Sequence, residues 1–174
     1  MKFEPAPLKD AWIIREDPIG DDRGYFARAF CKKEFANHGI DFNVAQINTC
    51  FNMSAGTIRG LHYQSDPAAE PKFVRCIRGA MWDVMVDMRP ESSTYLQYFG
   101  IELTEDNQTM VYLPGNFAHG FQTLKPETQA YYLVGEYYTP QCENGIRHND
   151  PALGIEWPVE VSEISDKDKS WSLL

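Results

Sequence analysis

Most of the chain alternates apolar and polar residues with the two-residue period of a β-strand. Across residues 81–88 the even-numbered positions are apolar, whereas the odd-numbered positions alternate methionine with aspartate. Residues 99–103 follow a similar alternation, and β-branched and aromatic residues dominate the short runs 73–77, 110–113 and 129–134. Turn-forming residues such as Pro114-Gly115-Asn116 separate these runs. The pattern predicts a series of short antiparallel strands.

Helix is expected in only two short stretches. Lys32–His38 is followed by Gly39, a residue that commonly ends a helix, and Ser165–Trp171 has the length of one or two helical turns. Short strands separated by turns predict an all-β sandwich or barrel of the jelly-roll kind. No repeat or linker interrupts the 174 residues, so we expect a single domain over residues 1–174.

Composition narrows the classes of function. Acidic residues outnumber basic ones by 25 to 16, and the net charge of −9 argues against a nucleic-acid partner or an anionic membrane surface. No apolar run approaches the roughly 20 residues of a spanning helix, and the first ten residues lack the layout of a secretory signal. The four cysteines form no CxxC pair. We therefore expect reduced thiols and a cytoplasmic location.

The densest group of reactive side chains is Arg59-Gly60-Leu61-His62-Tyr63-Gln64. On a regular strand Arg59 points to one face and His62 to the other. Lys72 opens the next β-rich run, so on neighbouring strands His62 and Lys72 would reach one cavity. Histidine suits a general base, and lysine stabilises a developing oxyanion. Spacing alone favours the plainer interpretation, a partly buried histidine with a lysine at the rim.

A second histidine, His119, lies between apolar residues in Phe117–Phe121, where a structural core histidine is the usual interpretation. His62 and His119 together also suggest a metal site. A catalytic metal usually has at least three protein ligands. The chain has no His-x-His, and no glutamate closely follows His62. The metal-free interpretation is therefore preferred.

Other candidate groups have a structural and a functional interpretation each. Tyr132 and Tyr138 would share one face of a strand, where packing is the common role, but a phenol in a polar cavity can donate a proton. Asp168 lies in a charged turn, and folded onto a histidine it would orient the ring. Arg23 and Arg59 suit either surface ion pairs or bidentate binding of phosphates.

In combination these residues resemble the dTDP-4-dehydrorhamnose 3,5-epimerase family, nucleotide-sugar epimerases of the cupin fold. The resemblance runs from about Asp22 to Asp168. The motifs that carry it are Asp22-Arg23-Gly24, Arg59-Gly60-Leu61-His62-Tyr63-Gln64, Lys72, Asp83-Val84 with Val86-Asp87, Phe117-Ala118-His119-Gly120-Phe121, Tyr132, Asn149-Asp150-Pro151, Gly154-Ile155-Glu156-Trp157-Pro158 and Ser165-x-Lys167-Asp168.

The resemblance implies a cupin-type jelly-roll barrel with short peripheral helices. It also implies a homodimer that exchanges strands, and an enzyme without metal or redox cofactor. The implied substrate is a nucleoside-diphosphate 4-keto-6-deoxyhexose of the dTDP-4-dehydro-6-deoxyglucose type. Such a product would serve the synthesis of deoxysugars such as rhamnose and of surface polysaccharides.

The resemblance also implies a role for individual residues. His62 matches the general base, Asp168 the carboxylate that orients it, and Tyr132 the proton donor on the opposite sugar face. Lys72 matches the residue near the sugar O4, and inversion would occur at C3, C5 or both through an enolate. The implied substrate-binding residues are Arg23, Arg28, Gln46, Asn48, Arg59, His119, Tyr138, Glu143 and Lys167.

Two departures from the family pattern affect specificity. Arg28 replaces the usual glutamate and Ile47 the usual aspartate, at positions expected to read nucleotide or sugar. Arg28 predicts a preference for a base that presents acceptors, such as cytosine, over thymine. The alternatives are a mono-epimerase or 4-keto-sugar isomerase on another nucleotide sugar such as a CDP-sugar, a non-catalytic sugar-nucleotide binder, and a metal-dependent cupin enzyme.

Overall fold

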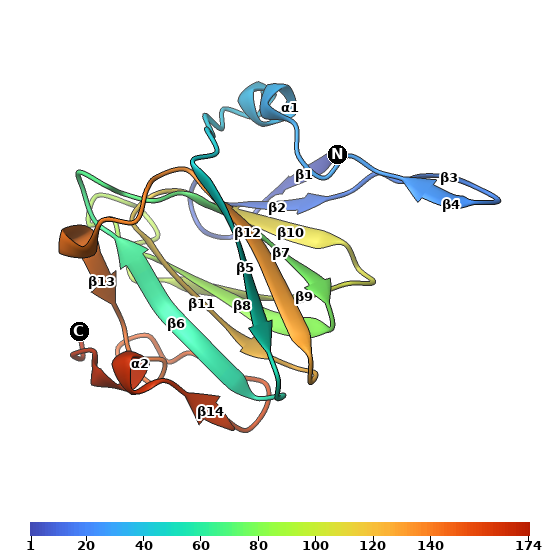
Figure 1. Cartoon of the computed structure of the whole chain (residues 1–174). Helices are drawn as coiled ribbons and strands as arrows, with labels where there is room; N and C mark the ends of the chain where they lie inside the picture. The colour runs from blue at the N-terminus through green and yellow to red at the C-terminus, as the bar shows by residue number, and fades with distance from the viewer.

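A computed structural model describes residues 1–174, and its strands form two antiparallel sheets that pack face to face (Figure 1). Sheet I contains, in spatial order, β1 (Lys2–Pro5), β2 (Trp12–Arg15), β10 (Thr109–Leu113), β7 (Lys72–Arg78), β12 (Thr128–Val134) and β5 (Gln46–Asn52). Sheet II contains β13 (Glu143–Gly145), β6 (Thr57–Gln64), β11 (Phe117–Thr123), β8 (Ala80–Asp87) and β9 (Tyr98–Thr104), and β14 (Glu163–Ile164) pairs with β6 in parallel. The expected all-β jelly-roll arrangement is confirmed.

The remaining elements lie at the periphery. They are the hairpin of β3 (Ile19–Asp21) and β4 (Gly24–Phe26), the helices α1 (Lys32–Asn37) and α2 (Asp166–Ser170), and a 3-10 turn, η1 (Pro140–Cys142). Both helices were predicted, and all five predicted strand runs lie in or overlap strands of the structure. Neither helix is long or apolar enough to span a membrane.

The main core lies between the two sheets. Its buried side chains include Met81 and Met85 from β8 and Val74 and Val111 from sheet I. Trp82, Val84 and Val86 of β8 instead belong to a second cluster on the outer face of sheet II. The mixed face of this strand therefore points into the sandwich, and it places the carboxylate of Asp83 in the interior.

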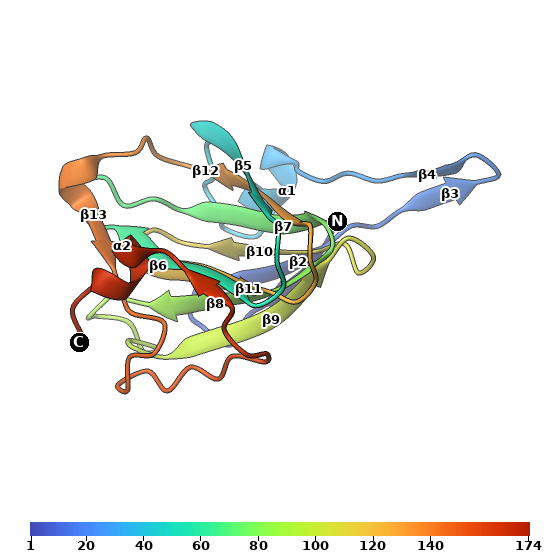
Figure 2. The same ribbon diagram turned by 60° about the horizontal axis from the view of Figure 1, so that its bottom comes forward.

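The outer faces of both sheets are covered by other parts of the chain. α1 and the segment after it place Phe35 and Phe42 on sheet I, against Phe73 and Leu133. Residues 146–157 cover sheet II. Figure 2 shows α2 and β14 beside β6, so that the C-terminal segment lies along one edge of the sandwich. β5, at the edge of sheet I, and β6 of sheet II border the site described next.

Candidate active site

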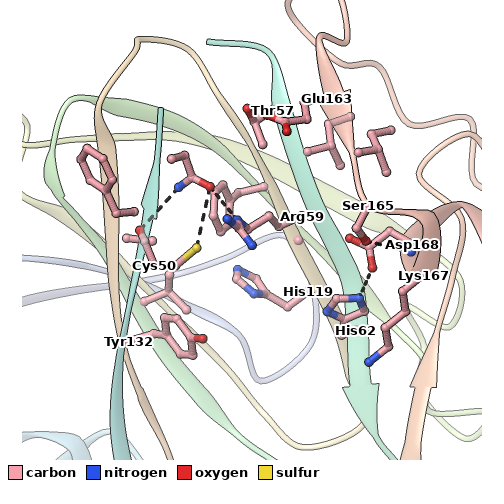
Figure 3. A pocket seen from close by; sticks show the side chains of 18 of the residues that line it. Cys50, Thr57, Arg59, His62, His119, Tyr132, Glu163, Ser165, Lys167 and Asp168 are labelled. Carbon is pink, nitrogen blue, oxygen red and sulfur yellow. Dashed lines mark hydrogen bonds and ion pairs between the residues drawn. The ribbon is translucent and has the colours of Figure 1, made fainter. Parts of the chain in front are cut away.

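A cavity of about 530 Å³ lies between β5 at the edge of sheet I and β6 of sheet II. Side chains from both sheets and from α2 line it (Figure 3). Of the residues proposed from the sequence, those that line the cavity are Arg59, His62, Lys72, His119, Tyr132, Lys167 and Asp168. Arg59 and Asp168, which lie 109 positions apart in the sequence, thus line the same cavity.

A bulge in β6 brings Arg59 and His62 to the same cavity. His62 pairs with His119 and Arg59 with Phe121, so three steps on β6 match two on β11. The residue between them, Gly60, has φ +111, and a Cβ there would lie 2.6 Å from the backbone of β11. An extra residue in one strand reverses the side-chain alternation. The prediction that Arg59 and His62 face opposite ways was therefore wrong.

His62 and Asp168 form a close pair at the cavity wall. Nε2 of His62 lies 2.5 Å from Oδ1 of Asp168, and the Gly60 N–H donates to Oδ2 over 3.2 Å. Burial alone would raise the pKa of Asp168, but the hydrogen bonds from His62 and Gly60 outweigh burial and lower it. Asp168 is held by α2, where the Asp168 N–H donates to the capping Oγ of Ser165. With Nε2 engaged, Nδ1 of His62 is the nitrogen with a free lone pair.

Lys72 and Tyr132 approach from the opposing sheet. Nζ of Lys72 lies 3.2 Å from Glu70 Oε2 and donates to the His62 carbonyl over 3.3 Å. His62 and Lys72 reach one cavity, although their strands are not neighbours. β6 and β7 belong to different sheets that face each other. Burial raises the pKa of Tyr132, so its phenol keeps its proton at neutral pH.

His119 also pairs with an aspartate. Its Nε2 lies 2.8 Å from Oδ2 of Asp83, a residue on β8 whose side chain is completely buried. In the sequence Asp83 belongs to the motif Asp83-Val84, and nothing in that motif predicts a role for it. The signal was present, because Asp83 lies on the mixed face of a strand that elsewhere buries methionine.

Three further candidates meet at Lys167, the one of them that lines the cavity. The Tyr138 hydroxyl donates to Glu143 Oε2 over 3.0 Å, and Nζ of Lys167 lies 2.5 Å from Glu143 Oε1. Tyr138 lies beyond the end of β12, so the prediction that it shares a strand face with Tyr132 was wrong. The strand ends before it because the chain turns toward η1.

On β5, the candidate residues Gln46 and Asn48 lie on one face, and Ile47, which departs from the family pattern, lies on the other. Asn48 pairs with Tyr132 and Gln46 with Val134, so both lie on the cavity side of β5, beyond the residues that line the cavity. Ile47 pairs with Leu133 of the outer cluster and is exposed on the opposite face. The strand alternation thus turns Ile47 away from the cavity of its own chain, contrary to the expectation that it reads the substrate there.

Arg23 and Arg28 do not lie in this cavity. Arg23 follows β3 at the tip of the hairpin, where it pairs with Asp21 at 2.5 Å and its side chain is 89% exposed. Nε of Arg28 lies 3.8 Å from Glu34 in α1. Within one chain, neither arginine is placed to contact a ligand at His62.

The structure adds polar residues that sequence reasoning missed. Asn52 Oδ1 accepts the Arg59 Nε–H over 2.6 Å, and Glu70 accompanies Lys72. Asn52 follows the alternation of β5, whereas nothing local marks Glu70. No group of three or more His, Cys, Asp or Glu side chains is placed to hold a metal ion.

The fold, together with the proteins that share it, places the chain in the class of cupin-type jelly-roll epimerases that act on nucleotide sugars. Within that class, the chain belongs to the dTDP-4-dehydrorhamnose 3,5-epimerase family, whose sequence profile matches residues 5–174. It is an enzyme of the isomerase class.

Relatives with this fold include both bifunctional and single-centre epimerases. The dTDP-4-dehydrorhamnose 3,5-epimerase of Sinorhizobium fredii is 40% identical over 171 residues, covering 98% of this chain and 88% of that protein. The Bacillus anthracis 3,5-epimerase, solved with TDP and PPi bound, has a TM-score of 0.95 at 40% identity, covering 99% of both chains. A 3'-monoepimerase from Streptomyces bikiniensis in complex with dTDP-quinovose has a TM-score of 0.89 at 32% identity, covering 97% of this chain and 86% of that chain.

Proposed function

We propose that the chain inverts C3 and C5 of a nucleoside-diphosphate 4-keto-6-deoxyhexose, with dTDP-4-keto-6-deoxyglucose as the first substrate to test. A proton next to a ketone is acidic enough to remove because the resulting enolate places its charge on the ketone oxygen. Inversion requires a base on one face of the sugar ring and an acid on the other.

The observation that carries this proposal is the position of a base and an acid on opposing sheets. His62, backed by Asp168, lies on β6 of sheet II, and Tyr132 lies on β12 of sheet I. Both side chains line the same cavity. A sugar ring between the sheets would therefore present one face to the imidazole and the other to the phenol.

The remaining cavity residues suit the charges of such a substrate. Lys72 would stabilise the negative charge that grows on the ketone oxygen. Electrostatic stabilisation of this kind is often the largest contribution to catalysis. Arg59 and His119 would contact the sugar and the diphosphate, with Gln46 and Asn48 as further polar contacts. The phenol of Tyr132 would return a proton to the opposite face, since burial keeps it protonated.

The nucleotide would lie at the end of the cavity where Tyr138, Glu143 and Lys167 meet. The Tyr138 ring is exposed there and offers a face on which a base can stack. Glu143 and Lys167 hold each other in place and offer one acceptor and one donor group. This arrangement supports a pocket for the nucleotide on the solvent side of the sugar.

The hairpin of β3 and β4 would complete the site of a second copy of the chain. It projects away from its own sandwich (Figure 1), and its apolar residues Ile19, Tyr25 and Phe26 are exposed. A two-stranded hairpin of this length is marginal in water by itself. We therefore propose a homodimer in which this arm joins the partner's sheet and brings Arg23 to the partner's diphosphate.

The base specificity of the nucleotide is tested together with the reaction. Purified protein is incubated in D₂O with dTDP- or CDP-4-keto-6-deoxyglucose, with and without EDTA, and followed by proton NMR. We expect deuterium at both C3 and C5 and inversion at both carbons, unaffected by EDTA. Faster turnover of the CDP-sugar would support the base preference predicted from Arg28.

Each other outcome identifies an alternative. Deuterium at one carbon only would indicate a mono-epimerase, and loss of activity in EDTA would indicate metal-dependent chemistry. Tight binding of both nucleotides without exchange at either carbon would contradict the proposed reaction and favour a sugar-nucleotide binder.

A further inference from the structure

The carboxylate of Asp83 lies in the interior of the sandwich with one polar partner. The side chain is 0% exposed, and its neighbours on the same face of β8 are Met81 and Met85. Oδ2 contacts Nε2 of His119 at 2.8 Å, whereas Oδ1 has no hydrogen-bond partner. A buried carboxylate with an unpaired oxygen costs free energy. Packing alone gives no reason for an aspartate at this position.

The partner of this carboxylate faces the cavity. His119 pairs in register with His62 on the adjacent strand, so both imidazoles point to the same side of sheet II. Figure 3 shows His119 in the middle of the cavity, between His62 and Tyr132. Nε2 of His119 is directed at Asp83, and no group of the chain bonds to Nδ1. The other nitrogen is therefore free for a ligand.

We propose that Asp83 is a positioning residue that acts through His119. Its carboxylate accepts the Nε2–H of His119, which holds the ring in one orientation and presents Nδ1 to the bound sugar. This inference rests on the proposed function for its effect on turnover. Proteins retain groups that reduce stability mainly where function needs them, and a buried carboxyl group with an unpaired oxygen is such a group.

A neutral isostere separates positioning from packing. In Asp83→Asn the amide can either accept from or donate to Nε2, so the orientation and tautomer of His119 are no longer determined. We expect kcat to fall by roughly 10²-fold, with KM changed by less than about 3-fold, because a displaced contact at the reacting sugar weakens transition-state binding. The melting temperature should stay within a few degrees of wild type or rise.

Asp87 provides a matched control on the same strand. It is equally buried, but its carboxylate is bound by Arg89, Ser92 and Thr94 and does not line the cavity. Asp87→Asn should lower the melting temperature and leave kcat near wild type, the reverse of Asp83→Asn. If both variants lose stability and activity in parallel, Asp83 is structural and the proposal is wrong.

A double-mutant cycle tests whether Asp83 acts through His119. In a His119→Gln background, Asp83→Asn should cause no further loss of kcat, because the ring that it positions is absent. A further loss of similar size would overturn the proposal.

One measurement does not depend on turnover. The chain has four histidines, so ¹⁵N–¹H spectra of the imidazoles can be assigned with single variants. We expect His119 to carry a slowly exchanging Nε2–H in wild type, absent in Asp83→Asn. A His119 protonated at Nδ1 alone would overturn the inference even if epimerase activity is found. The expected Nε2–H signal without activity on any 4-keto sugar would instead contradict the proposed function.

Discussion

Tyr132 has the protonation state that its proposed role requires. A proton donor must keep its proton until the enolate forms, and burial raises the pKa of this phenol. The base has the opposite need. His62 donates Nε2–H to Asp168 and so offers Nδ1 as an acceptor. The two groups lie on different sheets, so neither can replace the other on its face of the sugar.

This division of labour predicts the effect of Tyr132→Phe. His62 can still remove the proton and return a deuteron to the same face, so exchange at that carbon should continue within about 10-fold of wild type. Inversion should fall by roughly 10²–10⁴-fold, the usual contribution of a general acid. Proton NMR in D₂O measures both rates in one sample. Equal losses of exchange and inversion would contradict the assignment of Tyr132 as the donor.

At the scale of elements, α2 holds the carboxylate of Asp168 in place. It has only five residues, and an isolated helix of this length is not stable in water. Ser165 caps its N-terminus by accepting from the Asp168 N–H over 3.1 Å, and the parallel pairing of β14 with β6 fixes where the helix begins. The position of Asp168 thus depends on a cap and on two residues of strand.

Ser165→Ala should therefore reduce activity through the loss of its cap on Asp168, although Ser165 also lines the cavity. Loss of the cap costs about 1 kcal/mol locally, which frees Asp168 for part of the time and leaves His62 less well oriented. We expect kcat to fall by several-fold, with only a small change in melting temperature. Ser165→Thr keeps a capping hydroxyl and should retain activity. An equal loss in both variants would show that the cap is not what matters.

The end of β8 should contribute to acid stability. Burial would raise the pKa of Asp87, but hydrogen bonds from Arg89, Ser92 and Thr94 outweigh it and lower the pKa to about 2. Because the pKa of Asp87 is lower in the folded than in the unfolded chain, the group stabilises the fold at pH values above 3.8, the pKa in the unfolded chain. This stabilisation is lost as the pH falls toward 2. It amounts to about 2 kcal/mol. Urea denaturation between pH 7 and 3 should show a shallower loss in Asp87→Asn than in wild type.

The strands could be predicted from the sequence because alternation follows directly from which face is buried. The alternation failed to predict the side-chain directions around Gly60. The bulge there arises from the register with β11, which cannot be read from the sequence of one strand. The pair of His62 and Asp168 joins residues 106 positions apart, and no spacing rule predicts such a contact. The motifs suggested it only through a family resemblance. Asp83 was visible as a polar residue on a mixed face, but its partner was not.

At the scale of the whole molecule, the hairpin of β3 and β4 is the least satisfied part. Ile19, Tyr25 and Phe26 are 75%, 59% and 66% exposed, and Arg23 at the tip is remote from the cavity of its own chain. The outer face of β5 also exposes an apolar residue, Ile47. Exposed apolar groups that lie on a projecting arm and on a sheet edge are typical of surfaces that meet in an oligomer.

Exchange of this arm predicts that two inactive variants restore each other. Arg23→Ala leaves a pocket with its base but without the arm's arginine, and His62→Asn leaves the arm but no base. In a mixed dimer, the pocket of the Arg23→Ala chain receives an intact arm from its partner. Because the interface is symmetric, equal mixing should recover roughly a quarter of wild-type activity.

A second mixture shows whether such recovery reflects the arm. His62→Asn and Tyr132→Phe alter residues that line the same cavity of one chain, so no pocket in their mixed dimer is complete. This mixture should stay inactive, and sedimentation should show dimers in both. If the Arg23→Ala mixture also stays inactive although mixed dimers form, the arm does not serve the partner's site. In that case Arg23 reaches the active site of neither chain, and the exchanged arm would have only a structural role.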